Sequence, residues 1–125
     1  MARKKSPTLT EAELRLMEIL WEKGSATVNE VLQELPKRLP LAYNTVLTTL
    51  RILERKGYIQ HEKEGRAFIY QPVVGRSEAR RKAVKYVVSR FFNNSPGLLL
   101  LNVMEHETID EDELRRLKKL IGEGE

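Results

Sequence analysis

The chain has 125 residues, and its 22 Lys and Arg against 18 Asp and Glu give a formal net charge of +4. This length accommodates one domain or two small modules and excludes most large enzyme folds. Hydrophobic residues make up 41% and charged residues 32% of the chain, which excludes a disordered or a membrane-embedded protein and favours a helix-rich one.

The absence of cysteine removes several kinds of chemistry. Disulfides, thiolate metal ligands and a cysteine nucleophile are all excluded. The basic N-terminus is not followed by the apolar segment of a secretory signal, and the longest apolar run, residues 98–101, is far too short to cross a bilayer. We therefore expect a cytoplasmic protein without membrane insertion.

The first two helices are predicted from capping boxes, in which a threonine is followed three residues later by a glutamate. Thr10 opens a helix that ends near Gly24, and Thr27 opens a shorter one that ends before Pro36. The residues expected on their buried faces are Leu14, Met17, Leu20 and Trp21 in the first, and Val28, Val31, Leu32 and Leu35 in the second.

A third helix is predicted from about Ala42 to Lys56, and its two faces differ in kind. Val46, Leu50 and Leu53 follow the spacing of a buried stripe. Another face carries short polar groups and then cations, without a carboxylate. This composition is typical of a helix in the DNA major groove, although an ordinary solvated face can have it too. The polar row consists of Asn44, Thr48, Arg51 and Arg55.

Two β-prone runs, residues 57–63 and 66–71, follow this helix around a Glu-Gly pair and predict a hairpin with a tight turn. Three short helices followed by a hairpin predict a winged helix-turn-helix, in which Lys63 and Arg66 at the hairpin tip reach the flanking DNA backbone. Residues 37–66 hold seven bases and three acids, so the positive charge is concentrated where DNA would bind.

The last fifty residues are predicted to form three helices, at about 78–92, 96–104 and 110–121. Ser77, Ser95 and Asp110 are the expected caps, and Gly122 is the expected end of the last helix. Helices this short cannot bury their apolar side chains internally, which favours a two-fold homodimer over a tail folded back on its own head. The expected dimerisation residues are Val84, Val87, Val88, Phe91, Leu98, Leu101, Met104, Leu114, Leu117 and Ile121.

The predicted fold class is therefore mostly α with a small β-hairpin wing. It comprises a winged helix-turn-helix DNA-binding head, residues 1–74, and a three-helix C-terminal dimerisation tail, residues 75–125.

The sequence resembles the penicillinase-repressor family of the BlaI/MecI type over nearly the whole chain. The resemblance implies a homodimeric winged-helix repressor of β-lactamase, penicillin-binding-protein or other operons, which binds a palindromic double-stranded operator. It also implies inactivation by cleavage in the tail, triggered by a membrane sensor-protease system. The residues that carry the resemblance are Leu9-Thr10 to Glu13, Met17, Leu20-Trp21, Tyr43 to Thr48, Leu53, Lys56 to Ile59, Gly65 to Phe68, Tyr70 and Pro72.

Some positions acquire roles from this resemblance. Thr45 and Thr48 match recognition-helix threonines, and Arg66 matches a wing arginine. Leu47 departs from the glutamine found in some members, so it would cover a thymine methyl instead of forming a hydrogen bond. The complete set of expected DNA-binding residues is Lys37, Arg38, Tyr43, Asn44, Thr45, Leu47, Thr48, Arg51, Arg55, Lys63 and Arg66.

In the tail, residues 101–103 resemble the Leu-Asn-Phe cleavage sequence of the family, with Val103 in place of the phenylalanine. The resemblance puts the scissile bond between Asn102 and Val103, although these residues also suit a plain helix core. The copper-responsive branch of the family, which has a cysteine-rich tail, is excluded by the lack of cysteine.

Three alternatives compete with a repressor. An enzyme has little support, because His61 and His106 belong to no ligand or triad pattern, and the acidic residues 105–113 lack the glycine of a calcium loop; we expect no metal and no cofactor. A small-molecule-responsive regulator would keep the DNA-binding head and hold an effector in the helical tail. A protein-interaction adaptor would use the winged helix for a protein partner.

Overall fold

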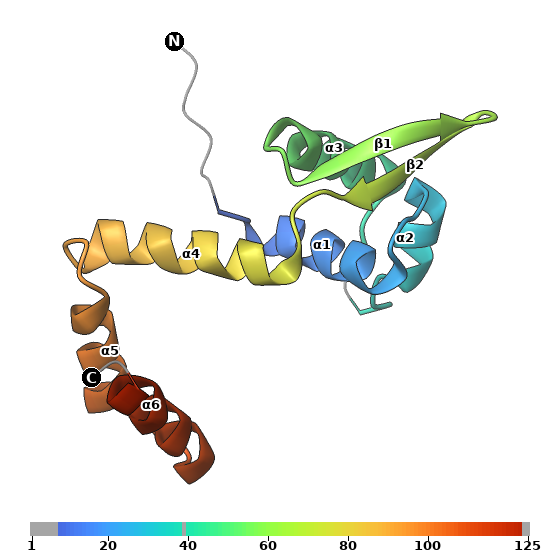
Figure 1. Ribbon diagram of the computed structural model, residues 1–125. Coiled ribbons are helices and arrows are strands. Elements are labelled where there is room, and N and C mark those ends of the chain that lie inside the picture. Colours follow the sequence, from blue (N-terminus) through green and yellow to red (C-terminus); the bar gives the residue numbers. More distant parts are fainter. Residues whose placement is uncertain (1–7, 39, 124–125) are drawn as a thin grey trace. The chain divides into compact units, whose positions relative to one another are not determined.

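The computed structural model describes residues 8–38 and 40–123, which form six helices and one hairpin (Figure 1). This confirms the predicted fold class. The elements are α1 (Glu11–Lys23), α2 (Val28–Glu34), α3 (Tyr43–Arg55), β1 (Ile59–Glu64), β2 (Ala67–Pro72), α4 (Arg76–Phe91), α5 (Pro96–His106) and α6 (Glu111–Glu123). The chain divides into two compact units, and the division falls within α4 between Tyr86 and Val87.

Both predicted capping boxes are present. In α1 the hydroxyl of Thr10 accepts a hydrogen bond from the backbone N–H of Glu13 at 3.2 Å, and the Glu13 carboxylate accepts one from the Thr10 N–H at 2.9 Å. Thr27 and Glu30 repeat this exchange at 3.2 and 2.8 Å. The backbone N–H of Thr27 holds the pKa of Glu30 below its usual value, since the bond favours the ionised carboxylate.

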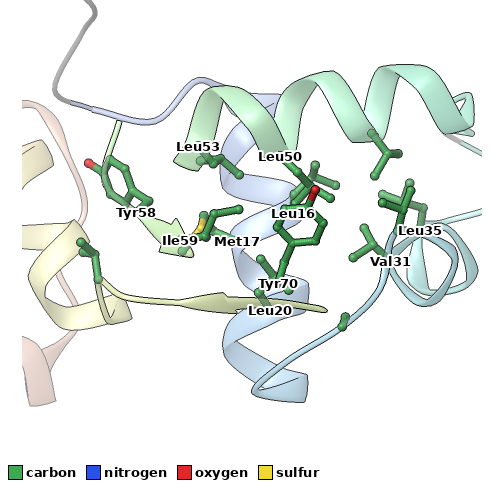
Figure 2. Close-up of a cluster of buried hydrophobic side chains, with 14 of the residues drawn as sticks. Leu16, Met17, Leu20, Val31, Leu35, Leu50, Leu53, Tyr58, Ile59 and Tyr70 are labelled. Atoms are coloured by element: carbon green, nitrogen blue, oxygen red, sulfur yellow. The ribbon is translucent and has the colours of Figure 1, made fainter. Parts of the chain in front are cut away.

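The core of the first unit lies among α1, α2, α3 and the hairpin (Figure 2). The predicted stripe of α3 is confirmed, because Val46, Leu50 and Leu53 are completely buried. The prediction for α1 is wrong at Leu14, which is 40% exposed. The helix turns Glu13 and Leu16 toward the core instead, and Leu14 lies one position round from Glu13.

The hairpin is antiparallel, with Ile59 opposite Pro72 and Glu64 opposite Ala67. Its two-residue turn contains Gly65 at a φ of 62°, a left-handed conformation that glycine adopts without steric cost. The backbone of Tyr70 also exchanges hydrogen bonds of 2.8 and 2.9 Å with Ala26, between α1 and α2. This bridge fixes the base of the hairpin to the helices.

The segment after the hairpin is fixed by the single tryptophan of the chain. The indole N–H of Trp21 donates to the carbonyl of Val74 at 2.9 Å, and the guanidinium of Arg76 lies 5.3 Å from the centre of the Trp21 ring. Both contacts lie within the first unit.

The helix ends of the last fifty residues agree only in part with the prediction. Ser95 caps α5, and the Asp110 carboxylate accepts from the Glu113 N–H at 2.8 Å before α6, as predicted. Ser77 is not a cap, because α4 already begins at Arg76. Gly122 does not end α6, which continues to Glu123 because a glycine can remain helical in a terminal turn.

Candidate nucleic-acid interface

One face of α3 is left uncovered by the first unit. Asn44, Thr48, Arg51 and Arg55 are all exposed, on the side opposite the buried stripe. Thr45 is exposed as well, and its carbonyl accepts from the hydroxyl of Thr49 at 2.8 Å. The helix therefore offers short polar groups in its first half and two guanidinium groups in its second half.

The residues around the start of α3 extend this surface. Lys37 and Arg38 are exposed in the turn before it, and Tyr43, its first residue, is 48% exposed. Leu47 differs from these, because it is half-buried and packs against the core. Only part of its side chain is open to a partner.

The wing contributes its tip. Lys63 is exposed near the end of β1, and Arg66 is exposed in the two-residue turn. Figure 1 shows the hairpin extending beyond α3, with this turn at its far end. A partner that extends beyond the exposed face of α3 could therefore also contact the tip of the hairpin.

One of the seven bases in residues 37–66 is buried and stabilises the fold instead of facing solvent. The Lys56 ammonium lies 2.7 Å from the Glu13 carboxylate, and these side chains are only 7% and 6% exposed. Lys56 also donates to the carbonyl of Thr8 at 3.1 Å. The basic segment thus has six exposed bases and not the seven counted from sequence, namely Lys37, Arg38, Arg51, Arg55, Lys63 and Arg66.

A groove of about 460 Å³ lies between the second half of α3 and the hairpin. The Nδ1 of His61 lies 2.7 Å from the Glu54 carboxylate, and the His61 ring packs at 4.8 Å from the ring of Phe68 and 5.6 Å from that of Tyr70. Burial, with a smaller effect of Glu54, raises the pKa of Tyr70. The lining residues are Arg51, Glu54, Arg55, His61, Phe68 and Tyr70.

This groove is not predicted from the sequence, in which His61 belongs to no pattern and the polar row of α3 contains no carboxylate. In the structure Glu54 lies beside that row and lines the groove with His61. The signal was available in principle, because residues 61 and 63 of a strand share one face with their cross-strand partners, Tyr70 and Phe68.

The second unit leaves its apolar side chains exposed or only half-buried, with Val88 as the one buried residue among those that the structure describes. In α5 no residue is buried, and the most exposed large apolar side chains of the unit are Phe91 at 76% and Leu120 at 67%. Of the residues predicted for dimerisation, Val88 is buried, Val87, Leu114 and Leu117 are half-buried, and Val84, Phe91, Leu98, Leu101 and Met104 are exposed; the side chain of Ile121 lies outside the described residues.

The predicted cleavage residues lie within α5. Asn102 is exposed, whereas Val103 is half-buried and lines an apolar groove of about 590 Å³ between α5 and α6. The bond between them is therefore inside a helix and not in a loop.

Most of the chain is similar to known proteins. The sequence model of the family called Penicillinase repressor matches residues 9–123. The chain belongs to this family. It is 32% identical to the penicillinase repressor of Bacillus licheniformis, over 96% of this chain and 94% of the relative. It is 26% identical to the methicillin resistance regulatory protein MecI of Staphylococcus aureus, over 94% and 95%.

Two solved structures resemble part of the chain. The DNA-binding domain of the repressor BlaI is 39% identical and covers 61% of this chain and 93% of its own, with a TM-score of 0.52. The monomeric form of Bacillus licheniformis BlaI in complex with the blaP half-operator has the same identity and coverage, with a TM-score of 0.50.

These relatives make the chain a member of a family of winged-helix, DNA-binding repressors, and repressors are not enzymes. Within the described residues, no group of three or more histidine, aspartate or glutamate side chains is placed to hold a metal ion. The described helices also include none with the length and apolar character needed to cross a bilayer.

Proposed function

We propose that this protein represses transcription as a homodimer on a palindromic operator, with α3 in the major groove and the wing on the adjacent backbone. The observation that carries the proposal is the uncovered row from Asn44 to Arg55 on α3, opposite a completely buried stripe. The similarity to a repressor solved with a half-operator supports it. The operon is one for β-lactam resistance or a related stress response.

Operator binding is tested first with duplexes selected from a random pool by the protein itself. Because the six exposed bases would meet phosphates, the affinity should fall steeply between about 50 and about 200 mM salt. Arg51→Ala should weaken binding about tenfold or more without a matching fall in melting temperature. Arg81→Ala, which removes an exposed arginine of α4, is the matched control. A flat salt dependence, or equal binding by Arg51→Ala, contradicts the proposed interface.

The tail, residues 75–125, is proposed as the dimerisation domain because it exposes large apolar side chains, among them Phe91 and Leu120, in a single chain. A two-fold dimer would place two copies of α3 about 34 Å apart, one DNA turn. Truncation before Leu98 should give a monomer with much weaker operator affinity. A truncated protein that still sediments as a dimer would remove α5 and α6 from the main interface.

Cleavage between Asn102 and Val103 is proposed as the inactivating event, with a membrane sensor-protease system as its trigger. Since the bond lies within α5, the helix has to unwind locally before a protease can bind it. Mass spectrometry of the protein from induced cells should give fragments that end at Asn102. Intact protein under full induction contradicts this step.

The second candidate is an effector-responsive regulator, and the apolar groove between α5 and α6 is the observation that favours it. Its polar lining is limited to Glu113 and Arg116, whereas the other seven lining residues are apolar, so the groove suits an apolar effector. A compound that releases the intact protein from its operator, without cleavage, would favour this candidate over proteolysis.

A further inference from the structure

We propose that the groove between α3 and the wing binds a DNA phosphate, and that His61 takes up a proton when the phosphate binds. This inference rests on the proposed DNA-binding function and adds to it a residue, His61, and a dependence on pH. Neither was apparent from the sequence.

The groove has the cations for a phosphate. Arg51 and Arg55 lie one turn apart on α3 and both line it. Neither forms an ion pair within the part of the chain that the structure describes, so their donors remain available. Guanidinium groups bind phosphate oxygens through charge-assisted hydrogen bonds, and a groove between a recognition helix and its wing lies where a DNA backbone would pass.

Glu54 opposes this binding. Its carboxylate lines the same groove and carries a full negative charge when the His61 ring is neutral. At 2.7 Å from the carboxylate, a protonated His61 would compensate that charge. The formal charge of Arg51, Arg55, Glu54 and His61 together is then +2 instead of +1.

The other polar groups that face His61 come from α3, from β2 and from its own strand. From α3 these are Arg51 and Arg55, and from β2 the neutral phenol of Tyr70, whose pKa is raised by burial. Lys63 lies two residues along β1 on the same face. Histidine is the one side chain among these types whose ordinary titration falls between about pH 6 and about pH 8.

The affinity for DNA should rise as pH falls. A bound phosphate favours protonated His61, so the bound state holds more protons than the free state. If a bound phosphate raises the titration midpoint of His61 by about one pH unit, the affinity for DNA should rise about tenfold from about pH 8 to about pH 6.

The test is fluorescence anisotropy with a short mixed-sequence duplex at fixed low salt, since phosphate contacts do not depend on sequence. The wild-type protein should gain affinity about tenfold toward pH 6. His61→Gln should lose most of this dependence. Glu54→Gln should bind more tightly at pH 8 and also respond weakly to pH. His106→Gln, which changes the other of the two histidines, is the control and should respond as the wild type does.

The outcomes distinguish a failure of the proton uptake from a failure of DNA binding. If His61→Gln binds with the same pH dependence as the wild type, the inference is overturned and DNA binding is left intact. A dependence that disappears in His106→Gln overturns it as well. If no duplex binds at any pH, the proposed function fails and the inference fails with it. NMR of the His61 ring tests the proton uptake without measuring affinity. The titration midpoint of the ring should move up by about one pH unit when duplex is added. A midpoint that does not move contradicts the proton uptake.

Discussion

The two units of this chain use apolar residues in different ways. In the first, side chains from three helices and a hairpin meet in one core, and Leu16, Leu50 and Leu53 are completely buried. In the second, α5 has no buried residue, and Phe91 and Leu120 are more than half exposed. Burial of apolar surface is the main favourable term in folding, so the first unit has its own source of stability. Among the residues of the second unit whose burial the structure describes, only Val88 is buried, so these residues form no comparable core in a single chain.

The largest effect is expected from damage to the core of the first unit. Leu50→Ala leaves a cavity at a completely buried position and should lower the free energy of unfolding by about 4 kcal/mol. Urea denaturation measures this. The matched change in the second unit, Leu101→Ala at 55% exposure, should leave the unfolding of the first unit unchanged and weaken self-association instead. Equal losses in the first unit would contradict the division.

A smaller effect is expected at the buried ion pair. Lys56→Met leaves the Glu13 carboxylate buried without its cation and should cost about 3 kcal/mol of stability. The double variant Lys56→Met, Glu13→Gln should recover much of this loss, because no buried charge then remains. A double variant as unstable as the single one would show that packing, and not charge, is what Lys56 contributes.

A third prediction concerns the helix caps. Thr10→Ala removes the hydroxyl that accepts from the Glu13 N–H and should destabilise the first unit by about 1 kcal/mol. Thr108→Ala, at an exposed position before α6, is the control with almost no expected effect. Thermal unfolding of both variants measures the difference, and equal melting temperatures would mean that the cap is not needed.

The smallest effects are expected from pH, and they differ between the units. Backbone N–H groups at the start of α6, chiefly that of Glu113, lower the pKa of Asp110, so this stabilisation exists above the unfolded pKa of about 4 and is lost as pH falls. Glu30 adds a similar acid response to the first unit. Burial raises the pKa of Tyr58, so this contribution exists below about pH 10 and is lost as pH rises.

These responses can be separated by experiment. Asp110→Asn should weaken the acid response of the helicity of α6, and Tyr58→Phe should weaken the alkaline response of the first unit. Hydrogen exchange of each unit across the pH range measures both. An acid response of α6 that persists in Asp110→Asn would assign it to other carboxylates.

Much of the fold is local and was therefore predictable from sequence. The capping boxes at Thr10 and Thr27 involve residues three positions apart, and the buried stripe of α3 repeats along one helix. The exposed polar row of α3 follows from the same periodicity. Leu14 was mispredicted because an apolar residue was assumed to take the core position that Glu13 occupies.

Two side-chain pairs that change the charge of the candidate interface could not be predicted from local sequence patterns. Lys56 meets Glu13 across 43 positions of sequence, and His61 meets Glu54 from a different element. Both pairs depend on tertiary packing, which no periodicity encodes. The DNA-binding and dimerisation residues, the cleavage bond and the boundary at residue 74 stay predictions, because each requires a partner or a perturbation.

The packing of Trp21 has a practical consequence for such experiments. It is the one tryptophan of the chain, and it lies against Arg76 with its indole N–H bonded to Val74, where the wing leads into α4. The emission of an indole in this position therefore responds to changes where α1 packs against the segment after the hairpin. Operator binding, proteolysis and subunit exchange can thus be followed optically in the unlabelled protein, wherever they disturb that contact.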